Sequence, residues 1–206
     1  PANPKFVTGH KDTLFFAGMS ANPQSLVYTA SFTDDDFSVA NGAGTINVDS
    51  DITGLFPFRD QLFVFCEERI FKLVGSTQAD FVMQPVTREI GCINGFTIQE
   101  VAGDIIFLGP DGLRTVAGTE RIGDVELGTI SRPIQRRFQG VSDVDEFDSV
   151  VVPDKTQYRI FFSNSSKSRG DTTGAIAVRK EQYEFADLRG IRPSSTDSIV
   201  TLGDTI

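Results

Sequence analysis

Short apolar runs recur along the chain, separated by clusters of glycine, aspartate and other polar residues. Alternating apolar and polar side chains, rich in β-branched and aromatic residues, indicate β-strands. The clearest turn is Pro110-Asp111-Gly112, where proline presets φ and glycine accepts a positive φ. The pattern predicts strands at Lys5–Thr8, Leu14–Ala17, Ser25–Ala30, Ile52–Phe58, Leu62–Phe65, Ile70–Val74, Phe81–Val86, Gly95–Val101, Ile105–Leu108, Leu113–Ala117, Asp148–Val152, Tyr158–Phe162, Ala175–Val178 and Glu184–Leu188.

An internal repeat organises these strands. An aspartate that opens an apolar run, followed by a turn, occurs at intervals of 43–50 residues, at Asp12, Asp60, Asp104, Asp154 and Asp197. Propeller blades have roughly this length and contain four antiparallel strands. The sequence therefore predicts an all-β fold, a β-propeller or an open arc of about four to five blades. A β-sandwich with fortuitous aspartate spacing is the alternative.

One segment predicts a short helix, Arg132–Phe138, with Ser131 as its N-cap and Pro133 in the first turn. The polar segments Thr33–Asn47 and Asn164–Thr173 predict solvated loops. No domain boundary interrupts the chain, so residues 1–206 are interpreted as one propeller-like repeat region. We expect it to be an excerpt of a longer polypeptide.

Alternation along the second strand of each repeat also predicts a core. Six apolar residues should be buried between blades: Phe16, Phe63, Phe65, Ile106, Leu108 and Phe161.

Charge limits the functional classes. With 19 basic and 28 acidic residues, the net charge is −9. Tight DNA binding needs clustered lysine and arginine, so a nucleic-acid-binding protein is disfavoured, whereas a wall past which DNA slides is compatible. No apolar stretch approaches the about 18 residues of a membrane span, and no membrane association is expected.

The residues available for chemistry are few: one histidine, two cysteines and no tryptophan. Cys66 and Cys92 lie in apolar surroundings and predict buried free thiols rather than a disulfide or zinc site. His10 is expected in an exposed turn. No nucleophile elbow or phosphate-binding loop occurs. We expect no enzymatic activity, no metal and no cofactor.

Several clusters of charged residues are candidate binding sites. Asp49, Asp51, Thr53 and Asp60 have the spacing of a calcium loop, but residues 52–58 predict a strand, which favours a solvated acidic turn. The remaining acidic clusters predict a charged loop or a channel lining: Asp34, Asp35, Asp36, Asp143, Asp145 and Glu146. A basic cluster on the predicted helix consists of Arg132, Arg136 and Arg137. It fits a solvated helix face or, because arginine pairs with carboxylates at interfaces, a subunit contact.

Seven short segments occur in a characteristic order along the chain: Asn22–Tyr28, Leu62–Phe65, Ile70–Ser76, Ala79–Phe81, Ile90–Cys92, Phe107–Gly112 and Ser131–Ile134. Together they resemble a series of segments common in virion proteins of tailed bacteriophages, in particular the tail nozzle, or tail tubular, protein of short-tailed phages. The resemblance covers roughly residues 10–138, whereas residues 140–206 share only the repeat pattern.

The resemblance implies a structural subunit with a β-propeller platform around a DNA channel and without catalytic residues. It would form a homo-oligomeric, six-fold ring in the virion tail, dock with an adaptor and other tail proteins, and let viral DNA pass without specific binding. An acidic repeat chain that lacks a catalytic constellation agrees with a conduit. The alternatives are a protein- or glycan-binding propeller and a glycan hydrolase, whose paired carboxylates would line a cleft.

Overall fold

The fold is described from a computed structural model, which covers residues 2–116, 129–134, 138, 147–162, 172–180 and 182–189. Within these ranges fifteen strands form four antiparallel sheets, and the helical segments with described bounds are single 3-10 turns. Each sheet is a meander whose strands pair in chain order. The all-β prediction is therefore confirmed.

The first two sheets each have four strands. Sheet 1 comprises β1 (Phe6–His10), β2 (Thr13–Ala17), β3 (Ser25–Tyr28) and β4 (Gly44–Asn47). Sheet 2 comprises β5 (Ile52–Phe58), β6 (Gln61–Cys66), β7 (Ile70–Val74) and β8 (Val82–Thr87).

The described part of sheet 3 has three strands, and sheet 4 has four. Sheet 3 comprises β9 (Gln99–Val101), β10 (Asp104–Gly109) and β11 (Gly112–Thr115). Sheet 4 comprises β12 (Phe147–Val152), β13 (Gln157–Phe162), β14 (Thr172–Arg179) and β15 (Tyr183–Arg189). The 3-10 turns are η1 (Val39–Asn41), η2 (Gly95–Thr97), η3 (Arg132–Ile134) and η5 (Pro153–Lys155).

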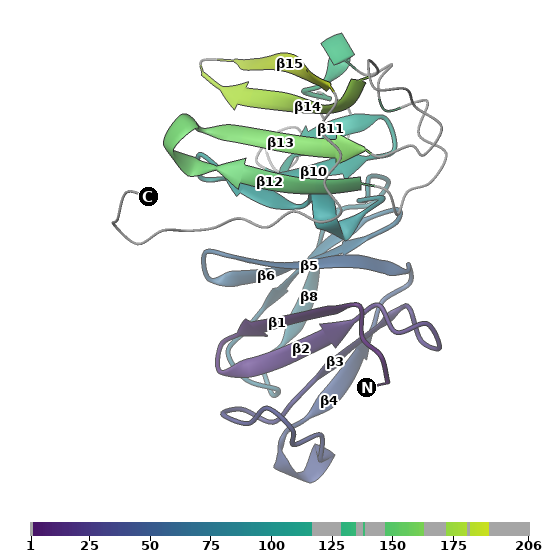
Figure 1. Ribbon diagram of the computed structural model, residues 1–206. Helices are drawn as coiled ribbons and strands as arrows, with labels where there is room; N and C mark the ends of the chain where they lie inside the picture. The colour runs from purple at the N-terminus through teal and green to yellow at the C-terminus, as the bar shows by residue number, and fades with distance from the viewer. Residues whose placement is uncertain are drawn as a thin grey trace.

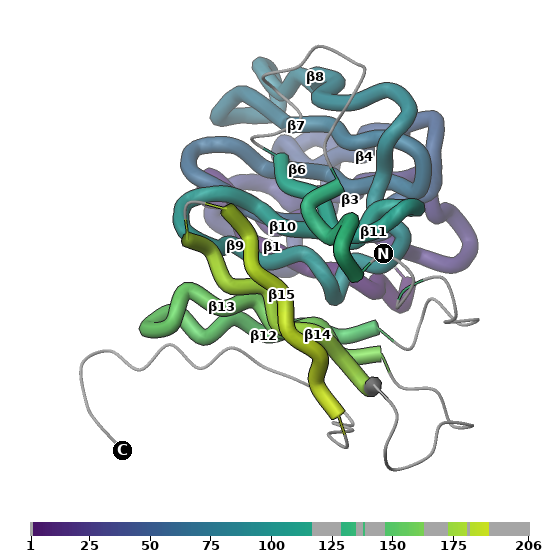
Figure 2. Tube along the Cα trace, turned by 90° about the horizontal axis from the view of Figure 1, so that it is seen from above, coloured from purple at the N-terminus to yellow at the C-terminus, as the bar shows by residue number. Residues whose placement is uncertain are grey.

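The sheets pack in series as an open stack, which Figure 1 shows from sheet 1 in purple to sheet 4 in green and yellow. The view from above, in Figure 2, places the purple sheet 1 at the far end of the stack. First strands adjoin at two of the three junctions, since β1 contacts β5 and β9 contacts β12, whereas β5 contacts η2, the turn that precedes β9. Four sheets in series differ from the two-layer sandwich that was the alternative.

Apolar clusters fill the three junctions between successive sheets. Phe15 and Ala17 of β2 pack against Leu62 and Val64 of β6. On its other face, β6 presents Phe63 and Phe65 to sheet 3, and the Phe65 and Phe107 ring centroids lie 5.3 Å apart. The third junction joins Ile106 and Leu108 of β10 to sheet 4. Because side chains alternate along a strand, both faces of β6 and β10 are buried.

Most predicted strands are confirmed, and Ile52–Phe58 and Ile70–Val74 have the predicted bounds. The prediction of a strand at Gly95–Val101 is wrong for its first half, which forms the turn η2. Only the second half is a strand, the short β9. Asn94 accepts a hydrogen bond from the Phe96 amide at 2.8 Å, which closes this turn instead of continuing a ladder.

Two further predictions need correction. The predicted loop Thr33–Asn47 contains β4, which pairs with β3 along its whole length. The predicted helix Arg132–Phe138 begins as the 3-10 turn η3, in which the Ile134 amide donates to the Ser131 carbonyl oxygen at 2.8 Å. Residues 135–137 lie outside the described residues.

The repeated aspartates lie at equivalent hairpins, but they do not occupy the same position in each hairpin. Asp12 and Asp60 are the second loop residues of the β1–β2 and β5–β6 hairpins. In sheet 3 the loop is Ala102-Gly103, and Asp104 already pairs with Val101 as a strand residue. Asp154 lies in η5, between β12 and β13, whereas Asp197 lies outside the described residues.

Four of the six predicted core residues are buried between sheets: Phe63, Phe65, Ile106 and Leu108. Phe161 is buried too, but on the face of sheet 4 that points away from sheet 3. Phe16 is not, because it points away from sheet 2 while its neighbours Phe15 and Ala17 point toward it. The alternation was correct, but the face was wrong for sheets 1 and 4.

Replacing Phe65 with alanine should lower the free energy of unfolding by about 3–5 kcal/mol, because the side chain is completely buried between two sheets. Urea melts of the purified chain measure this loss. Phe32, 84% exposed, is the matched control, and its alanine variant should lose less than about 0.5 kcal/mol. Equal losses in both variants would contradict the packing described above.

Candidate interaction surfaces

The acidic cluster Asp34–Asp36 lies in the β3–β4 connection. Asp36 accepts hydrogen bonds from the Ser38 amide at 2.8 Å and from the Asn41 side-chain amide at 2.7 Å, and these bonds lower the pKa of Asp36. This carboxylate therefore folds its own loop, whereas Asp34 and Asp35 are exposed. Asp143, Asp145 and Glu146 lie outside the described residues.

Of the predicted basic cluster, the structure describes Arg132 alone. It is exposed and begins η3, beside the buried Ser131. Ser131 Oγ accepts a hydrogen bond from the Leu113 amide at 2.9 Å, so the segment is attached to β11. Arg136 and Arg137 lie outside the described residues, and their interface role stays a prediction.

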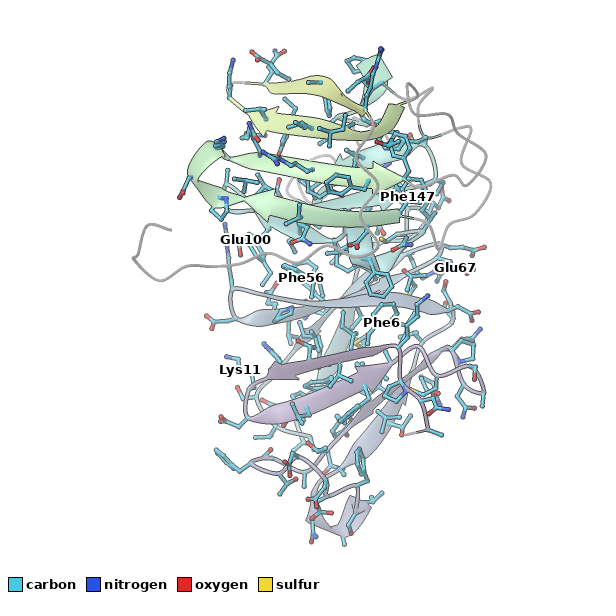
Figure 3. All side chains as sticks on the ribbon, viewed as in Figure 1. Phe6, Lys11, Phe56, Glu67, Glu100 and Phe147 are labelled. Atoms are coloured by element: carbon cyan, nitrogen blue, oxygen red, sulfur yellow. The ribbon has the colours of Figure 1, made fainter. Side chains whose placement is uncertain are left out.

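The first strands of the four sheets form a row that Figure 3 shows through Phe6, Phe56, Glu100 and Phe147, from β1, β5, β9 and β12 respectively. Their charged residues are Glu100 and Asp148, and these four strands contain no lysine or arginine. A hollow of about 480 Å³ opens here between β5, β9 and β12. The row is apolar and weakly acidic.

A polar cluster around η2 links sheets 3 and 4 next to this row. Tyr158 of β13 donates to the Thr97 carbonyl oxygen at 2.8 Å, and the Leu108 amide of β10 donates to Thr97 Oγ1 at 3.1 Å. Ser149 of β12 donates to the Phe96 carbonyl oxygen at 2.7 Å. Each of these bonds depends on η2, which the sequence pattern did not reveal. These hydrogen bonds satisfy buried polar groups and fix the position of sheet 4 relative to sheet 3.

The outer face of sheet 1, which points away from sheet 2, is exposed and apolar. Val7, Phe16 and Val27 lie across β1, β2 and β3 in one row, and Val7 is 54% exposed. The Phe37 ring centroid lies 5.5 Å from that of Phe16. Beside this row lies a hollow of about 590 Å³, lined by Gly9 and Leu14 among others.

The calcium-loop spacing does not correspond to a metal site. β5 begins at Ile52, and Asp49 instead pairs with Arg69 at 2.6 Å. Asp60 lies on the separate β5–β6 hairpin. Among the described residues, no group of three or more histidine, cysteine, aspartate or glutamate side chains has the arrangement of a metal site.

His10 is buried, so the prediction of an exposed turn residue is wrong. It is the last residue of β1 and pairs with Thr13 across the hairpin, with its ring 9% exposed and facing sheet 2. Burial, and then the charge of Lys11, lower the pKa of His10, while Asp60 opposes them. A neutral, buried imidazole next to Phe15 is a packing residue here.

Both cysteines are buried free thiols, as predicted. Cys66 belongs to the cluster between sheets 1 and 2, and Cys92 to the cluster between sheets 2 and 3. Burial is the main reason that the pKa of each thiol is raised to about 12. Neither thiol is a nucleophile at neutral pH.

Comparison with known proteins gives no further assignment, because no family model matches the chain and no curated protein matches it. In the described part of the chain, no helix has the length and hydrophobicity needed to cross a membrane.

Both thiols should resist iodoacetamide at about pH 8 in the folded protein, because alkylation requires a thiolate and access. Mass spectrometry should show both cysteines alkylated once the chain is unfolded in urea. Rapid, complete modification of Cys66 or Cys92 in native buffer would contradict their burial.

The chain should lose stability as the pH falls from about 7.5 to about 5.5, because the unfolded chain binds a proton at His10 more readily than the folded chain does. The contribution of His10 is complete above its unfolded pKa of about 6.5 and is lost as the pH drops through that value. Urea melts at both pH values measure the change.

A His10→Gln variant is the control. It should show a smaller difference in stability between the two pH values, because glutamine does not titrate. An unchanged pH dependence in this variant would show that other groups cause it.

Proposed function

We propose that this chain is a structural protein of a phage virion, a subunit of a tail nozzle ring that forms part of the DNA ejection channel. In this proposal the four sheets are consecutive blades of an open propeller arc. The ring is homo-oligomeric, with six-fold symmetry, and contacts an adaptor and other tail proteins. The chain catalyses no reaction and binds no cofactor.

The observation that carries the proposal is the serial packing of the sheets with their first strands side by side. In a β-propeller, sheets pack face to face and surround a central channel. The contacts between β1 and β5 and between β9 and β12 agree with that geometry. So does the phage-protein resemblance, which implies a propeller platform around a channel.

Charge supports the conduit more weakly. The first-strand row contributes Glu100 and Asp148 and no lysine or arginine, and the whole chain has a net charge of −9. Acidic side chains repel phosphates, so such a surface retains passing DNA poorly.

A protein-binding scaffold is the second candidate, and the observation that favours it is the exposed apolar outer face of sheet 1. Large exposed apolar patches usually mark interaction sites. The two candidates differ in location, because a conduit subunit surrounds the DNA path and a scaffold does not have to.

Electron cryomicroscopy of the particle that contains this protein tests the proposal. We expect several symmetry-related copies in a ring coaxial with the DNA, with the first-strand row toward the axis. A single copy away from any rotational axis would contradict the assignment. An outer position with a saccharide in a cleft would favour the glycan-binding or hydrolase alternatives, and the carboxylates of that cleft would become the residues to mutate.

A further inference from the structure

The three junctions between sheets follow one rule, which defines two kinds of face. We call the face toward the preceding sheet the leading face and the face toward the following sheet the trailing face. Second-strand residues identify the leading faces: Leu62 and Val64 on β6, Ile105 and Phe107 on β10, and Tyr158 and Ile160 on β13. All six side chains are 0% exposed. In sheets 2, 3 and 4, the preceding sheet therefore buries these second-strand residues of the leading face completely.

Sheet 1 has a leading face of the same kind on which no sheet of the described chain packs, although the Phe37 ring of the β3–β4 connection lies against Phe16. Leu14 and Phe16 of β2 occupy the positions that Leu62 and Val64 occupy in β6, two and four residues after the repeat aspartate. Both are only half-buried, and Val7, paired with Phe16, is 54% exposed. The residues on this face are apolar at the same positions as those of a buried junction, but they are only partly buried.

The strands on this face carry no charge. In a chain with 23% charged residues, the positions that the strand registers place on it are Val7, Gly9, Leu14, Phe16, Ser25, Val27, Thr45 and Asn47. The bond from Ser25 to Asn47, at 2.8 Å, lies on the same face. Depletion of charge is the compositional mark of an interface core.

Sheet 4 ends the stack with a trailing face. The strand registers place Val150, Arg159 and Ile176 in one row across β12, β13 and β14, next to Phe161. Phe161 is buried, whereas the three residues of the row are half-buried. In the three existing junctions, a leading face is always covered by a trailing face. The two ends of the stack thus present one face of each kind, and no sheet of the described chain packs on either.

Both ends carry charge. The hollow beside Leu14 has Asp12, Asp34 and Lys11 around it, and the Lys11 ammonium lies 3.7 Å from the Asp60 carboxylate. The sheet 4 row has Arg159 at its centre, whose planar guanidinium suits carboxylates. The strand registers place Asp148 and Glu184 on the same face, and Glu184 pairs with Lys180 at 2.6 Å. A contact between the two ends therefore requires Arg159, rather than these carboxylates, to lie next to the acidic margin of the hollow.

We propose that the leading face of sheet 1 docks on the trailing face of sheet 4 in a second copy of this chain. This contact is head-to-tail, and such contacts generate rings when the rotation closes and filaments when it does not. The inference rests on the proposed function and deepens it by naming the contact between ring subunits, but its evidence is the two end faces of the stack, and it is tested without the particle.

Sedimentation of the purified chain, from about 1 to about 100 µM, should show mass increasing with concentration. Val7→Asp places a charge on the sheet 1 face, and Arg159→Glu reverses the charge on the sheet 4 face. Each variant alone should stay monomeric over this range. A one-to-one mixture should form a dimer and stop there, because each variant keeps the face that the other has lost.

Val82→Asp is the matched control, because Val82 is 51% exposed but lies on β8 at the edge of sheet 2. It should assemble as the unmodified chain does, and thermal melts should show that all three variants fold. A monomeric unmodified chain would overturn the inference and indicate that another partner, or another part of a longer chain, covers the face.

Two further outcomes also oppose the inference. Loss of assembly in Val7→Asp but not in Arg159→Glu would indicate a symmetric contact between two sheet 1 faces. Assembly in both variants would place the contact elsewhere. None of these results decides whether the protein lies in a phage tail, which the position in the particle tests separately.

Discussion

Burial of the second strand on both faces is the constraint on which the stack depends. In β6 and β10 every side chain from the second strand position onward is buried, so each strand belongs to two junctions at once. Such a strand must be apolar at consecutive positions rather than at alternate ones. The junctions are therefore not independent, because a change in Phe65 or Phe107 alters one sheet's contact with its neighbour and also the strand that supports the next junction.

Apolar packing alone does not fix how far one sheet rotates on the next, and the η2 segment supplies polar contacts that do. Thr97 receives bonds from two different sheets, and Thr53 of β5 donates to the Cys92 carbonyl oxygen at 2.6 Å. Gly95 permits this close approach, since a Cβ there would collide with the Thr53 carbonyl oxygen. Directional bonds between buried groups cost more to break than the non-directional packing around them, so they specify one arrangement.

The sequence predicted most strands because alternation and turn residues are local signals, but it could not say which face has a partner. Phe15 and Phe16 are chemically alike, and only the position of sheet 2 decides that Phe15 is the buried one. The third hairpin shows the same limit, because Gly103 takes the loop position that Asp60 has in sheet 2 and shifts the pattern by one residue. The polar cluster was less predictable still, since Thr97 meets Ser149 and Tyr158 only because sheet 4 packs on η2.

The perturbed pKa values among the described residues follow from the same packing. Burial raises the pKa of Tyr158 and of both thiols and lowers that of His10, so that all four stay neutral inside junctions at neutral pH. Asp36, whose pKa is lowered by hydrogen bonds from its own loop, is ionised and holds that loop. Buried groups are thus kept neutral where apolar side chains surround them, and a charged group is kept where amide groups donate to it. In both cases the perturbation accompanies contacts that stabilise the resting fold.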